Sequence, residues 1–330
     1  MKSSKKPNKG ILGLVGNTPL VELGDISHGL GSMISAKLES FNPTGSIKDR
    51  VALHFIEDAE SRGAINAGDV VVEATSGNTG TSLAMVTALK GYKCIIVQPE
   101  TVSPEKVKAV RTFGAEVILT PSGLLREDER SYYYVAERIA EEHEGIYLNQ
   151  YFNRINPEAH YRSTGPEIWR DTEGKVDAVV CGIGTGGTIT GVGRYLKEKN
   201  PGVKIIGVEP VGSVFRCYLK RGIIEKASKF RIEGIGKNFI PGVIDFRYID
   251  DVIQVSDSDS FCMVETLMRK EGILAGGSGG AAVAGALIYA QQIKRKENIV
   301  TILPDTGLKY FSRLCGGNSN QATFLRSVEG

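Results

Sequence analysis

Three observations predict a two-domain α/β protein in which mainly parallel sheets are covered by helices on both faces. Short runs rich in Val and Ile alternate with longer segments of helical period, which is typical of parallel βα units. The chain of 330 residues exceeds what one simple hydrophobic core usually holds, so two domains are expected. Several of the β-branched runs end in loops of glycine and hydroxyl residues, where strand-to-helix turns present unpaired backbone N–H groups.

The expected strands are the apolar, β-branched runs, and helices fill the segments between them. The strands are Ser32 to Leu38, Val70 to Glu73, Cys94 to Gln98, Glu116 to Leu119, Ala178 to Gly182, Ile205 to Val208 and Val300 to Leu303. Ser46 is placed to cap the helix that follows it, with Asp49 three residues later in a capping-box arrangement. Gly63 and Gly91 are expected at helix ends, and Asn200 to Gly202 breaks a later helix.

The composition excludes several kinds of partner. Lys and Arg number 40 against 38 Asp and Glu, a net charge of +2, so no strong field exists for nucleic acid or an anionic membrane. No apolar run reaches the roughly 18 residues that span a bilayer. The Lys-rich start is not followed by the apolar segment of a signal peptide. A cytoplasmic location is therefore expected.

The cysteines predict neither a disulfide framework nor a metal site. There are five, they are widely spaced, and no C-x-x-C pattern or nearby histidine pair accompanies them. They are Cys94, Cys181, Cys217, Cys262 and Cys315. Cys94 and Cys181 fall in expected strands, where a small buried thiol is the predicted role.

Lys48 is the residue that most strongly indicates chemistry. It follows a glycine-bearing loop, Asn42 to Ile47, and stands at the start of an expected helix. The positive end of the helix dipole and partial burial both disfavour the ammonium form, so a lysine there is suited to form a Schiff base. The alternative is a surface lysine, which composition alone favours.

A second loop, Thr75 to Gly80, joins the expected strand Val70 to Glu73 to a helix. Its glycines permit close approach to a ligand. Its hydroxyl and amide side chains are those of Thr75, Ser76, Asn78 and Thr79. With the N–H groups of the helix N-terminus they form a site suited to a small carboxylate, whereas a helix cap alone needs only one such side chain.

A third loop, Gly182 to Thr188, is rich in glycine and lies between the expected strand Ala178 to Cys181 and a helix. Its glycines allow the main chain to surround phosphate oxygens, while Thr185 and Thr188 add hydroxyl donors. No lysine follows the loop as it does in a Walker motif. The loop therefore indicates a phosphate site.

The same loop leaves other interpretations open. Gly182, Gly184 and Gly187 match the dinucleotide pattern G-x-G-x-x-G, and Glu209 stands near the distance expected of a ribose-binding acid. A nucleotide-binding dehydrogenase is thus an alternative, although it would leave Lys48 without a role. A purely structural glycine turn is the third option, for which the glycine cluster is unusually dense.

Ser278 lies in a fourth turn of small residues, Ala275 to Ala281, which leads into a helix. On its own such a turn is more often tight packing of a helix on a sheet. Combined with a reactive lysine, a carboxylate loop and a phosphate loop, it completes a pocket for an aldehyde-bearing phosphate cofactor and an amino acid. Pyridoxal 5′-phosphate is the cofactor that fits this set.

Five motifs make the sequence resemble the cysteine synthase and cystathionine β-synthase family of pyridoxal-phosphate enzymes, over roughly Leu12 to Leu314. The motifs are Gly16 to Leu20, Asn42 to Arg50, Thr75 to Gly80, Gly184 to Thr188 and Glu233 to Gly236. The resemblance implies a homodimer with the tryptophan synthase β-like fold, in which each chain has two three-layer α/β/α domains. It places residues 45–155 in a smaller, mobile domain and residues 1–44 with 156–330 in a larger one.

The resemblance also implies a role for each motif residue. Lys48 would hold the cofactor as a Schiff base and exchange the proton at the substrate Cα. Asn78 would hydrogen-bond the 3′ oxygen of the cofactor, and Ser278 would face its pyridine nitrogen. The substrate would be held, mainly through its α-carboxylate, by Thr75, Ser76, Asn78, Thr79 and Gln150. The phosphate would be held by Gly184, Thr185, Gly186, Gly187 and Thr188.

The implied reaction is β-replacement on serine or an O-activated serine through an α-aminoacrylate intermediate, as in a lyase or transferase of cysteine biosynthesis and transsulfuration. Formation of cystathionine from L-serine and L-homocysteine is expected first, because Ser103 to Val107, Arg130 to Tyr133 and Asn156 to Tyr161 resemble the cystathionine-forming branch. Formation of L-cysteine from O-acetylserine or O-phosphoserine and sulfide is the alternative, since Thr164 to Trp169 resembles a cysteine synthase. Candidate contacts to a large second substrate are Tyr132, Tyr161 and Lys237.

The ends of the chain set two further expectations. Animal cystathionine synthases carry a haem-binding extension and a regulatory domain pair, and neither is expected in this chain. Asp305 to Ser312 still resembles the last motif of the family core, whereas the tail after Leu314 departs from the family pattern.

Overall fold

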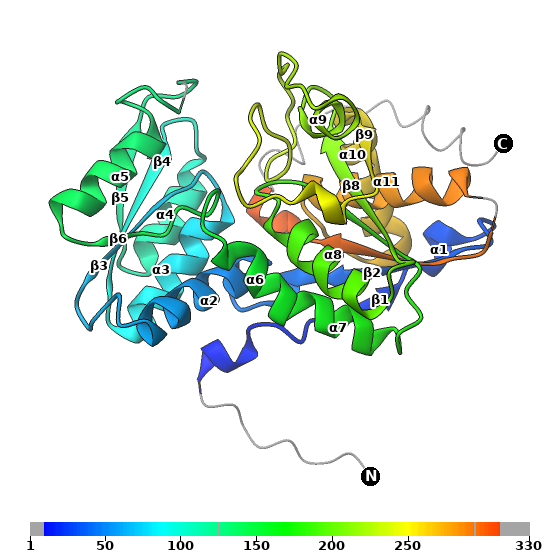
Figure 1. The fold of residues 1–330 in the computed structure, drawn as a ribbon, viewed down its shortest axis with the longest axis horizontal. Coiled ribbons are helices and arrows are strands. Elements are labelled where there is room, and N and C mark those ends of the chain that lie inside the picture. The colour runs from blue at the N-terminus through cyan, green and yellow to red at the C-terminus, as the bar shows by residue number, and fades with distance from the viewer. Residues whose placement is uncertain (1–9, 125, 294, 311–330) are drawn as a thin grey trace, which may run out of the picture. The chain divides into compact units, whose positions relative to one another are not determined.

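The computed structural model describes residues 10–124, 126–293 and 295–310, so the atypical tail after Leu314 lies outside the described residues. The chain forms two compact units (Figure 1). Unit 1 consists of the described residues up to Thr18 together with Phe41–Leu148. Unit 2 consists of Pro19–Ser40 and the described residues from Asn149 onward. These boundaries give the residues up to Thr18 to unit 1, whereas the sequence analysis expected residues 1–44 in the larger domain.

Unit 1 is built on a parallel sheet of four strands in the order β5-β4-β3-β6. The strands are β3 (Val70–Ala74), β4 (Lys93–Pro99), β5 (Glu116–Thr120) and β6 (Ile146–Tyr147). The helices are η1 (Ile11–Leu14), α2 (Lys48–Ser61), α3 (Asn78–Lys90), α4 (Pro104–Thr112) and α5 (Tyr132–Glu142). The start of α3 packs tightly between the sheet and α4, since a Cβ on Gly80 would lie 3.1 Å from Ile96 of β4 and 3.3 Å from Val110 of α4.

Unit 2 is built on six strands in the order β1-β2-β10-β7-β8-β9, of which only the edge pair β1–β2 is antiparallel. The strands are β1 (Leu20–Glu22), β2 (Met33–Leu38), β7 (Ala178–Gly182), β8 (Lys204–Pro210), β9 (Asp251–Val255) and β10 (Asn298–Leu303). The α-helices are α1 (Gly24–Ser27), α6 (Ile155–Arg162), α7 (Thr164–Asp171), α8 (Gly187–Lys199), α9 (Phe215–Arg221), α10 (Asp257–Thr266) and α11 (Gly277–Gln292). Shorter helical turns are η2 (Glu39–Phe41), η3 (Phe246–Tyr248), η4 (Leu267–Glu271) and η5 (Gly307–Tyr310).

Helices cover both faces of the unit 2 sheet. A Cβ on Gly193 of α8 would lie 3.3 Å from Ile205, whereas one on Gly285 of α11 would lie 2.5 Å from Val208. Ile205 and Val208 are three positions apart in β8, so they point to opposite faces. Helices α6, α7 and α8 pack together on one face, and α10 and α11 pack together on the other. The main hydrophobic core lies on the α11 face.

All seven expected strands are confirmed, with bounds that differ by at most two residues at either end. The sequence analysis missed β1, β6 and β9. Strands β1 and β6 have only three and two residues, too few to show a period. Strand β9 follows a polar loop and opens on Asp251, which masks its apolar run. Gly91 ends α3 in the left-handed conformation, and Asn200 ends α8, as expected.

The expected capping box at the start of α2 is wrong in its details. Helix α2 begins at Lys48, and the Ser46 hydroxyl accepts a hydrogen bond of 3.3 Å from the Lys48 N–H. The Asp49 carboxylate does not return to the Ser46 N–H as a capping box requires. It accepts a hydrogen bond of 2.7 Å from the Thr44 N–H instead.

Gly191 gives a test of the contact between α6 and α8. A Cβ at this position would lie 2.1 Å from the Pro157 carbonyl oxygen and 2.8 Å from the His160 Cβ. We expect Gly191→Ala to lower the free energy of unfolding by about 1–3 kcal/mol because the helices would have to separate. Urea unfolding followed by circular dichroism measures this effect. Gly24→Ala is the control, since its Cβ would contact nothing within 4 Å, and an equal loss there would contradict the argument.

Candidate active site

The structure places Lys48 at the first residue of α2, where its side chain is partly buried. The turn before it is held by Asp49, whose side chain is fully buried. The Asp49 carboxylate accepts hydrogen bonds from the N–H and hydroxyl of Thr44 and from the Ser82 hydroxyl, the last at 2.5 Å. Ser82 belongs to α3, so this carboxylate joins the start of α2 to the start of α3. The backbone that carries Lys48 is therefore fixed from two elements.

The loop from Thr75 to Gly80 follows the carboxyl end of β3 and leads into α3. Thr75 and Thr79 are buried, Asn78 is partly buried and Ser76 is exposed. The Thr75 hydroxyl accepts a hydrogen bond of 3.1 Å from the Gly77 N–H, which holds the turn closed. Gly77, the residue before α3, has no side chain to cap the helix, so the positive end of the helix dipole faces this loop without a capping group from Gly77. The loop keeps the features of an anion site.

The glycine loop from Gly182 to Thr188 follows β7 and leads into α8. Gly186 adopts a φ of 87°, a left-handed conformation that a residue with a Cβ rarely takes. A Cβ on Gly184 would lie 2.2 Å from the Gly234 carbonyl oxygen, so this glycine is required for close packing. Gly186, the residue before α8, has no capping side chain, and the Gly187 N–H donates a hydrogen bond of 3.3 Å to the Thr185 hydroxyl. The N–H groups at the start of α8 and the hydroxyls of Thr185 and Thr188 form a donor set that fits a phosphate.

Ser278 is buried near the start of α11, in the same unit as the glycine loop. Gly234 connects the two, because a Cβ on Gly234 would lie 3.8 Å from the Ser278 hydroxyl oxygen. The Gly234 carbonyl contacts the position of Gly184, as described above. Unit 2 therefore brings together the glycine loop, the segment around Gly234 and Ser278, which are far apart in the sequence.

Gln150 is also buried in unit 2 and lies beside the glycine loop. The Asn156 side-chain amide donates a hydrogen bond of 2.8 Å to the Gln150 carbonyl oxygen and another of 2.9 Å to the Thr185 hydroxyl. His160, which is fully buried, hydrogen-bonds the hydroxyls of Thr188 and Thr164 through its two ring nitrogens. The sequence analysis assigned no role to Asn156, since an asparagine early in a helix is typical of local capping.

The predicted site residues divide between the two units. Unit 1 holds Lys48, Thr75, Ser76, Asn78 and Thr79. Unit 2 holds Gln150, Gly184, Thr185, Gly186, Gly187, Thr188 and Ser278. Each unit brings its own predicted residues together, with the Lys48 amine and the Thr75 loop in unit 1 and the glycine loop and the buried Ser278 hydroxyl in unit 2.

The candidates for contact with a second substrate have different surroundings. The Tyr161 hydroxyl donates a hydrogen bond of 2.6 Å to the exposed Glu198 carboxylate. This contact gives Tyr161 a structural role at the surface. The Tyr132 hydroxyl bonds to the neighbouring Tyr133 hydroxyl. Lys237 donates a hydrogen bond of 2.9 Å to the hydroxyl of Tyr151, the residue that follows Gln150. Lys237 therefore contacts the segment that contains a predicted substrate ligand.

Glu209 does not support the dinucleotide interpretation of the glycine loop. Its side chain is fully buried at the end of β8. The carboxylate accepts hydrogen bonds from the N–H groups of Phe215 and Arg216 at 2.8 and 3.0 Å. It also accepts one from the Gln254 side chain at 3.1 Å. Glu209 therefore caps the start of α9 and is not presented to a ribose.

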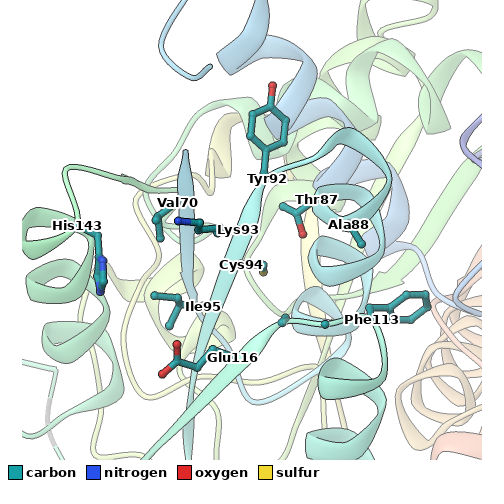
Figure 2. A pocket seen from close by; sticks show the side chains of 12 residues that line it. Val70, Thr87, Ala88, Tyr92, Lys93, Cys94, Ile95, Phe113, Glu116 and His143 are labelled. Atoms are coloured by element: carbon teal, nitrogen blue, oxygen red, sulfur yellow. The ribbon is translucent and has the colours of Figure 1, made fainter. Parts of the chain in front are cut away.

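A separate cavity of about 380 Å³ lies in unit 1. Figure 2 shows side chains that line it. The cavity lies where β3, β4 and β5 begin, whereas the Thr75 loop follows the opposite, carboxyl end of β3. Its lining includes Thr87, Lys93, Cys94, Glu116 and His143. Burial raises the pKa of the Cys94 thiol to about 12, so the thiol is not a nucleophile.

The buried cysteines give a chemical test of the sheet interiors. Burial raises the pKa of the Cys181 thiol to about 12 as well. At about pH 8 we expect Cys94 and Cys181 of the native protein to resist a maleimide and to react only after denaturation, because a thiolate is the reactive form. Peptide mass spectrometry identifies the labelled sites, and Cys217, which is partly exposed, is the internal control. Rapid native labelling of Cys94 would contradict the described packing.

The described residues lack two other kinds of feature. No group of three or more His, Cys, Asp or Glu side chains there could hold a metal ion. None of the described helices combines the length and apolar character needed to cross a membrane.

The fold and the composition of these loops define a class of enzyme that uses an organic phosphate cofactor. The sequence profile of the family described as pyridoxal-phosphate dependent enzymes matches residues 11–305. The chain belongs to this family, and its cofactor is pyridoxal phosphate. The expectations for the family, the fold class and the cofactor are thus confirmed.

The curated relatives of this chain include several cystathionine beta-synthases. The chain is 46% identical over 306 residues to the cystathionine beta-synthase of Rattus norvegicus, covering 92% of this chain and 54% of that protein. It is 44% identical to the cystathionine beta-synthase of Apis mellifera, covering 92% of this chain and 60% of that protein. The chain thus spans a little more than half the length of the curated relatives it matches.

Solved structures are similar over nearly their whole length. O-ureido-L-serine synthase has a TM-score of 0.88 at 36% identity, covering 98% of this chain and 100% of that chain. A hydrogen sulfide-producing enzyme from Fusobacterium nucleatum has a TM-score of 0.85 at 39% identity, covering 93% of this chain and 99% of that chain. Together these findings make the chain a pyridoxal-phosphate-dependent enzyme whose fold is that of these solved structures.

Proposed function

We propose that this enzyme forms cystathionine from L-serine and L-homocysteine. The observation that carries the proposal is the identity of 42–46% to cystathionine beta-synthases, which extends over at least 92% of the chain. The arrangement of the loops within each unit supports it. Related β-replacement enzymes differ in the nucleophile that they use and therefore in their product. The identity of the nucleophile is what a direct experiment has to establish.

The described residues fit the cofactor and give each loop a task. Bound pyridoxal phosphate supplies an electron sink that stabilises negative charge at the substrate Cα. We assign the amine of Lys48 to holding the cofactor and to moving the proton at the substrate Cα. The glycine loop would hold the phosphate through backbone N–H groups at the start of α8 and the hydroxyls of Thr185 and Thr188.

The remaining site residues orient the ring and the substrate. Asn78 would donate a hydrogen bond to the 3′ oxygen of the bound ring, and the Ser278 hydroxyl would face the ring nitrogen. A neutral hydroxyl does not protonate that nitrogen as a carboxylic acid would. The substrate carboxylate is held at the uncapped start of α3 by Thr75, Ser76, Asn78 and Thr79, together with Gln150.

A second candidate function is formation of L-cysteine from O-acetylserine or O-phosphoserine and sulfide. The similarity to a solved hydrogen sulfide-producing enzyme favours sulfur chemistry with a small nucleophile or product. Lys237 and Tyr151, which are hydrogen-bonded to each other, support the first candidate, because a cation near Gln150 suits the carboxylate of homocysteine.

One set of reactions separates the two candidates. The purified enzyme, loaded with pyridoxal phosphate, is mixed with each serine donor and with either homocysteine or sulfide, and the products are measured by mass spectrometry. Cystathionine formed from serine at a higher kcat/KM than cysteine from any donor supports the first candidate. The reverse order supports the second. Absence of both products with every donor would overturn both proposals.

A further inference from the structure

Helix α6 presents Asn156 and His160, which are fully buried and four residues apart, so they lie on one face of the helix. Both side chains reach the glycine loop. Asn156 contacts the Thr185 hydroxyl, and His160 contacts the Thr188 hydroxyl. Side chains of α6 therefore hydrogen-bond both threonine hydroxyl groups of the glycine loop.

The hydrogen bonds of Thr185 can be counted. Its hydroxyl oxygen accepts from the Asn156 side-chain amide at 2.9 Å and from the Gly187 N–H at 3.3 Å. A threonine hydroxyl has two acceptor positions and one hydrogen to donate. With both acceptor positions used, that hydrogen has to go to a third partner, and none of the described residues hydrogen-bonded to Thr185 accepts it. Thr185 is thereby prepared to donate to an anion.

The orientation of the Asn156 amide is determined by its partners. Its nitrogen donates both to Thr185 and to the Gln150 carbonyl oxygen, and only the NH₂ end of the amide can donate. Its oxygen lies against the loop, since a Cβ on Gly187 would be 2.0 Å away from it. The oxygen itself has no hydrogen-bond partner among the described residues. The amide thus has one consistent orientation and no room to shift.

We propose that Asn156 is a positioning residue that commits the Thr185 hydroxyl to donate to the cofactor phosphate and ties the Gln150 segment to the same loop. The inference rests on the proposed function of the glycine loop. It predicts that Asn156 affects binding of a phosphate ester through Thr185, whereas a residue with a merely structural role would affect every ligand of the site.

The test uses pyridoxine 5′-phosphate, which has the phosphate but no aldehyde to react with Lys48. Its dissociation constant is measured from the fluorescence of Trp169, the only tryptophan of the chain. Asn156→Ala and Thr185→Val are each expected to weaken binding about 10- to 100-fold, the effect of losing one hydrogen bond to a charged group. The double variant should bind no more than about 3-fold more weakly than Thr185→Val, since both changes remove the same interaction.

Unphosphorylated pyridoxine is the matched ligand, and its affinity is expected to be unchanged in both single variants. Fully additive effects in the double variant, or an equal loss of pyridoxine affinity, would overturn the proposal. Asn66→Ala, which alters an exposed asparagine of unit 1, is expected to bind like the wild type.

Asn156→Asp keeps the shape of the side chain. It replaces Asn156→Ala in the binding measurement if the alanine variant does not fold. Its carboxylate accepts the Thr185 hydroxyl hydrogen and adds negative charge beside the phosphate, so it should weaken binding at least as much as Thr185→Val. Wild-type affinity in Asn156→Asp would overturn the inference. If that variant binds normally while the wild type forms product, the proposed function stands and the positioning role fails. If the wild type binds no pyridoxal phosphate, the proposed function fails first.

Discussion

Replacing Lys48 with alanine is expected to lower the rate of β-replacement by at least about 10³-fold, because the same amine is assigned to hold the cofactor and to move the Cα proton. The side chain stands at the first residue of α2, where the Asp49 hydrogen bonds to Thr44 and Ser82 fix the backbone. The variant should therefore fold normally. The measurements are steady-state turnover, visible absorbance of the bound cofactor and the free energy of unfolding.

Lys48→Arg is the matched variant for this test. It keeps the positive charge and a similar length, but its guanidinium does not lose a proton in proteins and cannot serve as a nucleophile. We expect it to be as inactive as Lys48→Ala. Lys90→Ala, which removes a lysine paired with Glu60 near the surface of unit 1, should leave turnover unchanged. Retained turnover in Lys48→Ala would exclude the proposed role of the amine.

Lys37→Met is expected to lower the free energy of unfolding by about 3–5 kcal/mol. Lys37 is fully buried in β2, and its ammonium lies 3.0 Å from the Glu167 carboxylate and 2.9 Å from the Asp171 carboxylate. Methionine fills a similar volume but leaves Glu167, which is only 7% exposed, without this counter-charge. Urea unfolding of the apoenzyme measures the loss.

Two controls separate the effect of charge from that of packing. Lys175→Met removes an exposed pair with Glu173 and should leave the unfolding midpoint unchanged. Adding Glu167→Gln and Asp171→Asn to Lys37→Met should restore part of the lost stability, since no uncompensated charge would remain. A triple variant as unstable as Lys37→Met itself would show that packing, and not charge, determines the loss.

The strands and the ligand loops could be predicted because their signals are local. A β-branched run predicts its own strand, and a glycine-rich turn after it predicts its own anion site. Residues that act through distant neighbours gave no such signal. Glu209 fits the spacing of a ribose-binding acid. Only the structure shows that its carboxylate accepts hydrogen bonds from N–H groups at the start of α9. In the sequence, Asn156 is an ordinary helix residue. Its hydrogen bond to Thr185, 29 positions away, is seen only in the structure.

The order of strands in unit 2 has a consequence for synthesis on the ribosome. Strand β2 can pair with its antiparallel neighbour β1 as soon as both are synthesised. Its parallel neighbour β10 is synthesised much later, since Ser32 and Glu297, which directly precede the two strands and are hydrogen-bonded to each other, are 265 residues apart. All four strands of the unit 1 sheet lie within that interval. Contacts of such long separation form slowly, and domains tend to fold as they emerge. The unit 1 sheet can therefore be complete while the nascent unit 2 still has an open sheet edge at β2, which a chaperone could cover.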